Sequence, residues 1–129
     1  MAGPASNFIL ALISALLIVV ISLLHQNAEA PSQGSAQFAD LALDFMIYSI
    51  RINLILAIFN LFPIPPLDGS HVVASLLPPH LGEQYRSLGF TGMFILVAMM
   101  ALGIINRVME PIFTFLLGML SNLVRIMIG

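Results

Sequence analysis

The residues of this chain that could do chemistry gather around one acidic side chain, Asp68. It lies in the run NLFPIPPLDG at residues 60–69, which begins with an asparagine and ends with a glycine. His71 follows three residues later, so its imidazole and the Asp68 carboxylate could meet on one helical turn. Both groups are metal ligands, but a catalytic zinc takes three protein ligands and a water. The residues alone therefore offer part of a metal site.

Other common catalytic signatures are absent from the 129 residues. There is no H-E-x-x-H zinc motif, no G-x-S-x-G nucleophile elbow and no glycine-rich phosphate loop. The chain has no cysteine, which excludes a disulfide framework and a thiolate metal site. His25 and His80 are further candidate ligands by residue type alone, and His25 is equally typical of a helix end in water.

The composition indicates that these residues are embedded in a membrane protein. Hydrophobic residues make up 60% of the chain and charged residues 8%, whereas a soluble domain carries about 25% charged residues. The net charge of −2 leaves no basic stripe, so nucleic acid is a poor partner. We therefore expect an all-α membrane protein, a bundle of three to four transmembrane helices with a proline-rich loop breaking its centre.

Hydropathy predicts where these helices lie. We expect helices at about residues 4–24, 41–62, 90–105 and 111–128, and a short one at 70–77. The uncharged run from Phe8 to Leu24 has 17 residues, close to the ~20 that cross a bilayer. A signal peptide is the alternative, but no lysine or arginine precedes Arg51. The intervening segments read as polar connections.

The three prolines of the central run cannot continue a helix, because each lacks an N–H and displaces the residue before it. Irregular backbone and a charge are tolerated at membrane depth only where protein buries them or a wet cavity adjoins them. The loop is therefore the predicted site, with Asn60 and Asp68 at its ends. The plainer alternative makes Asp68 an anion just ahead of a short helix that Ser70 caps.

The second predicted helix carries polar residues at a regular spacing. Asn53 and Asn60 are seven apart and share one face, while Asp44 and Arg51 share another face rotated by roughly 100°. Polar groups inside a membrane usually face the bundle interior or a cavity. Asn53 could either bond to a neighbouring helix or line the site, whereas the position of Asn60 beside the proline loop favours the site.

The central run resembles the second signature of the site-2 proteases, the intramembrane zinc metalloproteases, which reads N-x-x-P-x-x-x-x-D-G. The sequence GPASN at residues 3–7 resembles the family's G-P-x-x-N segment, and the order and spacing of segments agree along essentially the whole chain. The resemblance implies a multi-pass protein of a bacterial or archaeal cell membrane. It also implies a zinc cofactor, and the hydrolysis of peptide bonds in transmembrane protein substrates within the lipid bilayer.

The resemblance further implies roles for single residues. Asp68 would be the third zinc ligand. Asn60 would line the catalytic site and hold the substrate backbone or the oxyanion, and Asn7 would help to position an unwound substrate strand. Pro63, with the other prolines, would fix the loop that aims the carboxylate. His71 falls on a variable position of the family pattern and receives no role.

In the family an H-E-x-x-H segment, with two histidine ligands and a glutamate base, precedes G-P-x-x-N. That segment is absent here, so we expect residues 1–129 to be the C-terminal portion of a membrane-embedded metalloprotease core, inactive by itself. A non-catalytic pseudoprotease that binds membrane helices is the alternative. A transporter segment is a third, because broken helices with amide and carboxylate groups also coordinate ions. A transporter would show a second interrupted helix, and the sequence shows none.

Overall fold

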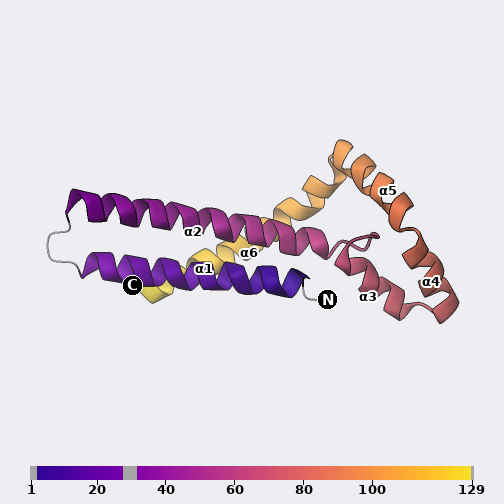
Figure 1. The fold of residues 1–129 in the computed structure, drawn as a ribbon, viewed down its shortest axis with the longest axis horizontal. Coiled ribbons are helices and arrows are strands. Elements are labelled where there is room, and N and C mark those ends of the chain that lie inside the picture. The colour runs from indigo at the N-terminus through magenta and orange to yellow at the C-terminus, as the bar shows by residue number, and fades with distance from the viewer. Residues whose placement is uncertain (1–2, 28–31, 129) are drawn as a thin grey trace.

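The computed structural model describes residues 3–27 and 32–128, and the regular structure in these residues is entirely helical. The described residues form six helices, whose arrangement Figure 1 shows. They are α1 (Gly3–Gln26), α2 (Gln33–Asn60), α3 (Asp68–Leu76), α4 (Pro79–Ser87), α5 (Gly89–Ala101) and α6 (Ile104–Ile128). Three of them, α1, α2 and α6, are long and apolar enough to cross a membrane. The predicted all-α bundle is therefore confirmed.

Helices α1 and α2 form an antiparallel hairpin that a polar seam holds together (Figure 1). The hydroxyls of Ser14 and Ser49 lie 2.8 Å apart across the two helices. The Asn53 side-chain amide donates to the Ser49 carbonyl at 2.8 Å and to its hydroxyl at 3.3 Å. Both of these Asn53 hydrogen bonds stay within α2, so they support Ser49, which bonds across to α1, and the two roles expected for Asn53 remain predictions.

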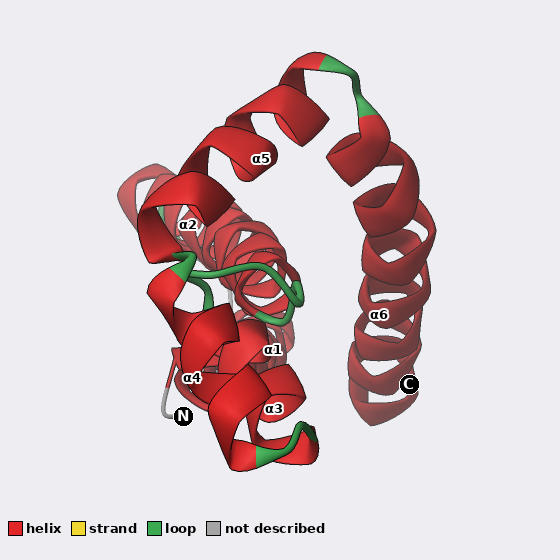
Figure 2. Ribbon diagram, turned by 90° about the vertical axis from the view of Figure 1, so that its right-hand side faces the viewer, coloured by secondary structure: helices red, strands yellow, loops and turns green. Residues whose placement is uncertain are grey.

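Helix α6 packs across this hairpin. Buried Ala11 and Ala15 of α1 and Ile50 and Leu54 of α2 form a core on which Leu117 and neighbouring residues of α6 lie. Small alanines let helix backbones approach closely, which is how membrane helices gain packing contacts. Figure 2 shows that α6 follows α5 in the chain. Helix α6 contacts both α1 and α2. The three candidate spans therefore share one apolar core.

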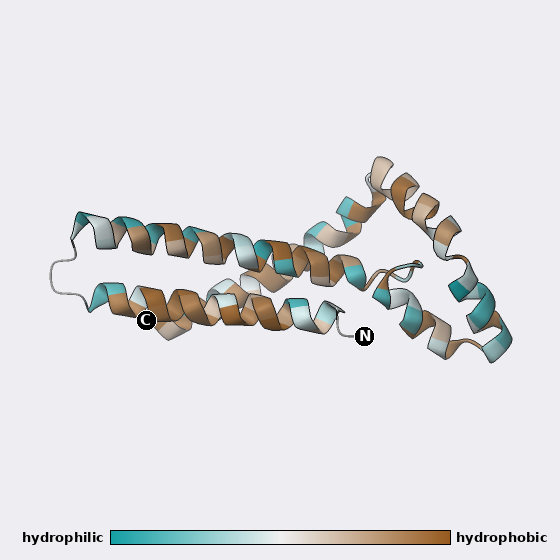
Figure 3. Ribbon diagram, viewed as in Figure 1, coloured by the Kyte–Doolittle hydropathy of each residue, from teal (hydrophilic) through white to brown (hydrophobic). Residues whose placement is uncertain are grey.

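Helices α3, α4 and α5 form an arm beyond one end of the hairpin (Figure 1). Figure 3 shows α4 as hydrophilic, in contrast to the largely hydrophobic hairpin. A second core joins the arm to the spans, in which Ile58 and Phe62 meet Leu96 of α5 and Ile105 of α6. The proline loop is thus anchored through Phe62.

Two predicted helix starts are wrong. Helix α2 begins at Gln33 and not near residue 41, because Ser32 caps it by accepting a hydrogen bond from the Ser35 N–H at 3.3 Å. Helix α3 begins at Asp68, so Ser70 lies inside it and does not cap it. The Ser70 hydroxyl donates instead to the carbonyl of the residue three positions earlier, at 2.7 Å.

Two other connections also differ from the prediction. The segment expected as a polar connection after residue 77 contains α4, which begins at Pro79, where a proline's fixed φ suits the first helical position. The break expected at residues 106–110 lies earlier, at residues 102–103, because Gly103 adopts φ 69° and ends α5. Helix α6 then continues through Pro111, so the charged residues expected in a break lie within a helix.

Candidate active site

Three helix ends meet at Asp68: the start of α1, the end of α2 and the start of α3. A Cβ atom on Gly3 would lie 2.5 Å from Asp68 Oδ2 and 3.7 Å from Asn60 Nδ2. Gly3 therefore contacts both side chains, and only a residue without a side chain fits there undisturbed. The structure thus brings together the two residues predicted at the ends of the proline loop, Asn60 and Asp68. Both are half-buried.

Asn7 lies one turn along α1 from this point. Gly3, Asn7 and Ala11 are spaced four residues apart and therefore share a helix face. Ala11 is 1% exposed against α2, which shows that this face turns toward the second helix. Asn7 itself is half-buried. The two predicted motifs, at residues 3–7 and 60–69, thus lie beside one another although they are far apart in sequence.

The proline loop is a compact turn. The Leu67 N–H donates to the Ile64 carbonyl at 2.9 Å, and the Pro65–Pro66 peptide bond is cis. A Cβ atom on Gly69 would overlap the backbone carbonyl of Leu61. The start of α3 therefore lies directly against the end of α2, and this close approach requires the glycine that follows Asp68.

The arm holds this loop from the other side. The Tyr85 hydroxyl of α4 donates to the Pro63 carbonyl. A Cβ atom on Gly92 of α5 would overlap the Pro65 carbonyl oxygen, so α5 also touches the loop backbone. The sequence did not point to either contact. A glycine within an apolar helix is a general sign of close packing, which could have drawn attention to Gly92; nothing marked Tyr85.

The donors near Asp68 do not make up a complete zinc site. No group of three or more histidine, cysteine, aspartate or glutamate residues that could hold a metal occurs in the described part of the chain. Structural and catalytic zinc needs four ligands, of which Asp68 could supply one oxygen. His25, His71 and His80 are exposed. The described residues could therefore supply one of the four ligands of such a site, through Asp68.

The charge of Asp68 also suits a structural role at the helix ends. It lies in the first turn of α3 and beside the start of α1. The N-termini of helices carry partial positive charge, which attracts an anion. No hydrogen bond from a described residue reaches the Asp68 or the Asn60 side chain. The carboxylate and the amide are therefore available to a group that binds between them.

Comparison with known proteins agrees with the two motifs. The family model described as peptidase family M50 matches residues 1–103. The Bacillus subtilis (strain 168) protein named "Putative zinc metalloprotease YwhC" is 39% identical over an alignment of 99 positions, and the alignment covers 74% of this chain. The aligned segment is 42% of that relative, so the chain spans less than half of its length. No solved structure was found to match.

Proposed function

This chain belongs to peptidase family M50, and on that premise we propose that it forms part of the catalytic core of a site-2-type intramembrane zinc metalloprotease. Family membership and three apolar spans make it a multi-pass integral membrane protein. The observation that supports the proposal best is the meeting of Gly3, Asn60 and Asp68, which joins both family motifs at one carboxylate. The substrate would be a transmembrane protein.

In this proposal Asp68 is one zinc ligand, and the remaining ligands come from outside the described residues of this chain. A bound zinc would supply a Lewis acid and an activated water. The Asn60 amide and the Asp68 carboxylate both lie next to Gly3. The amide would hold the substrate backbone or the oxyanion. Asn7, one turn along α1, would position an unwound substrate strand. Pro63 would fix the loop with the help of the Tyr85 hydroxyl.

The test is the variant Asp68→Ala in the natural protein that contains this chain. We expect its zinc content, measured by elemental analysis, to fall to background and its cleavage of a transmembrane reporter to be abolished. Asp40→Ala is the matched control, because Asp40 is an exposed acid of α2 far along the helix from the site. A fully active Asp68→Ala protein would overturn the assignment. A zinc-free, inactive wild-type protein that still binds membrane helices would favour the pseudoprotease.

A further inference from the structure

The loop between α2 and α3, residues 61–67, has few N–H groups with which to satisfy its own carbonyls, because three of its seven residues are prolines. The Ile64 carbonyl accepts from the Leu67 N–H within the loop, at 2.9 Å. The Pro63 carbonyl accepts from outside it, from the Tyr85 hydroxyl of α4. In the part of the chain that the structure describes, no other hydrogen bond joins α4 or α5 to this loop.

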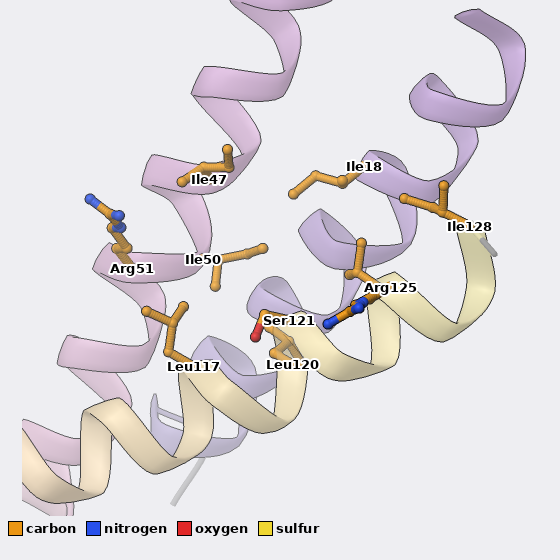
Figure 4. A pocket seen from close by; sticks show the side chains of 10 residues that line it. Ile18, Ile47, Ile50, Arg51, Leu117, Leu120, Ser121, Arg125 and Ile128 are labelled. Carbon is orange, nitrogen blue, oxygen red and sulfur yellow. The ribbon is translucent and has the colours of Figure 1, made fainter. Parts of the chain in front are cut away.

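Helix α6 supports the loop from its first half. Ile105 near its start and Phe62 of the loop belong to the same core. The second half of α6 instead borders a cavity of about 640 Å³ beside α1 and α2. Figure 4 shows side chains from all three helices around this cavity, among them Ile18, Ile50 and Leu117. None of the described loop residues lines it. This half of α6 therefore leaves the support of the loop to the arm.

A shift of the Pro63 carbonyl would be passed on to Asp68, five residues later. The turn at residues 64–67 is closed by its own hydrogen bond, and its two prolines have fixed φ angles. The Pro65 carbonyl also lies against the backbone of Gly92, which leaves the turn no room to move toward α5. The segment between the tyrosine contact and the carboxylate thus has few torsions that could absorb a displacement.

The Tyr85 hydroxyl acts on the loop and not on a reacting group. A phenol has one proton to donate, and here the Pro63 carbonyl accepts it. The same proton cannot be donated to a substrate while this bond exists. Tyr85 is half-buried, so its ring packs against the molecule whether or not the hydroxyl is present. Removal of the hydroxyl alone should therefore loosen the loop and leave the ring in place.

We propose that Tyr85 is a positioning residue for the Asp68 carboxylate, which its hydroxyl holds in place through the Pro63 carbonyl. The proposal rests on the proposed function, in which that carboxylate binds zinc. Metal–ligand distances tolerate only about 0.2 Å, so a loosened loop should weaken zinc binding even where the fold is intact. The arm thus sets the geometry of a ligand that lies outside α4 and α5.

The first test compares the two tyrosines of the chain in the natural protein that contains it. Tyr85→Phe removes the hydroxyl and keeps the ring. Tyr48→Phe is the matched control, because Tyr48 of α2 is 61% exposed and its hydroxyl bonds to no described residue. Zinc affinity, measured by competition with a chelator, should fall about tenfold in Tyr85→Phe, the lower end of the range for lost support of a metal ligand. It should be unchanged in Tyr48→Phe.

The second test reads the position of residue 68 without metal, through disulfide formation. This chain has no cysteine, and any cysteine outside it would be replaced by serine. Gly3→Cys and Asp68→Cys would place two thiols together, because a Cβ atom on Gly3 would lie 3.6 Å from Asp68 Cγ. Ser14→Cys with Ser49→Cys is the control pair, since those hydroxyls lie 2.8 Å apart within the hairpin.

With zinc removed by a chelator and a membrane-permeant oxidant added, Tyr85→Phe should slow the 3–68 disulfide at least about threefold. A misplacement of about 1 Å can cost about 100-fold in a reaction between positioned groups. The 14–49 disulfide should form at its original rate. A general loss of stability would slow both pairs alike, and that result would overturn the positioning role.

An unchanged rate for the 3–68 pair, or an unchanged affinity for zinc bound through Asp68, would overturn it as well. A wild-type protein that binds no zinc, or that keeps its zinc in Asp68→Ala, would overturn the proposed function instead. The two disulfide rates would then still decide whether Tyr85 positions residue 68.

Discussion

Replacing Gly3 with alanine should displace the Asp68 carboxylate and leave the fold nearly unchanged. The new Cβ atom would lie 2.5 Å from Asp68 Oδ2, and carbon and oxygen atoms in ordinary contact are about 3.4 Å apart. The carboxylate must therefore move by roughly 0.9 Å, the difference of these two distances. Metal–ligand distances tolerate about 0.2 Å. The displacement thus exceeds what a zinc site accepts several times over.

The stability cost of the same change should be small, because the atom in the way is the end of a rotatable side chain. Alanine also favours a helix over glycine by up to about 1 kcal/mol, which offsets part of the overlap. We therefore expect the melting temperature of Gly3→Ala in detergent to stay within about 4 °C of the wild type. Zinc affinity should fall by about 10- to 100-fold, as for changes that disturb the support of a metal ligand.

Gly34→Ala is the matched control, because nothing lies within 4 Å of a Cβ atom there. Both variants would be made in the natural protein that contains this chain, and zinc affinity would be measured by competition with a chelator. Wild-type zinc affinity in a folded Gly3→Ala protein would refute the reasoning. A melting temperature lowered by more than about 8 °C would refute it as well, since backbone and not the carboxylate would then have given way.

Three further predictions concern the loop and the metal. Tyr85→Phe should lower the free energy of unfolding by about 1 kcal/mol, because the Pro63 carbonyl loses its donor; unchanged circular-dichroism melting would contradict this. Gly92→Ala should cost about 1–3 kcal/mol in the same assay, because its Cβ overlaps a backbone oxygen, whereas Gly89→Ala meets nothing and should cost nothing. The isolated chain should bind zinc weakly through Asp68, so tight stoichiometric zinc after dialysis would contradict the assigned ligand count.

Much of the fold was predictable from the sequence, because the length and hydropathy of a segment indicate a membrane helix. The segments that form α1 and α2 contain longer apolar runs than a soluble domain usually has, and both helices are present. The boundaries were less predictable. The start of α2 at Gln33 depends on a single serine cap, and the end of α5 at Ala101 depends on one positive φ, that of Gly103. Such local choices change hydropathy very little.

The candidate site was predictable in its residues but not in its contacts. The carboxylate and amide stand out because charged and amide groups are rare in so apolar a chain. Tyr85 and Gly92 do not stand out, because a tyrosine in a polar helix and a glycine in an apolar one have many uses. Their contacts depend on how the arm folds back over Pro63, which no local pattern encodes.

The rigidity of the loop therefore comes from its neighbours as much as from its prolines. A proline fixes its own φ but not the distance between Asp68 and another helix. That distance depends on two glycines: Gly69 lets the start of α3 lie against the backbone at the end of α2, and Gly3 leaves room on α1 for the Asp68 carboxylate itself. The prolines also remove N–H donors, so carbonyls such as that of Pro63 must find donors elsewhere, and Tyr85 supplies one. The position of the carboxylate is thus set by all three helix ends and the arm together.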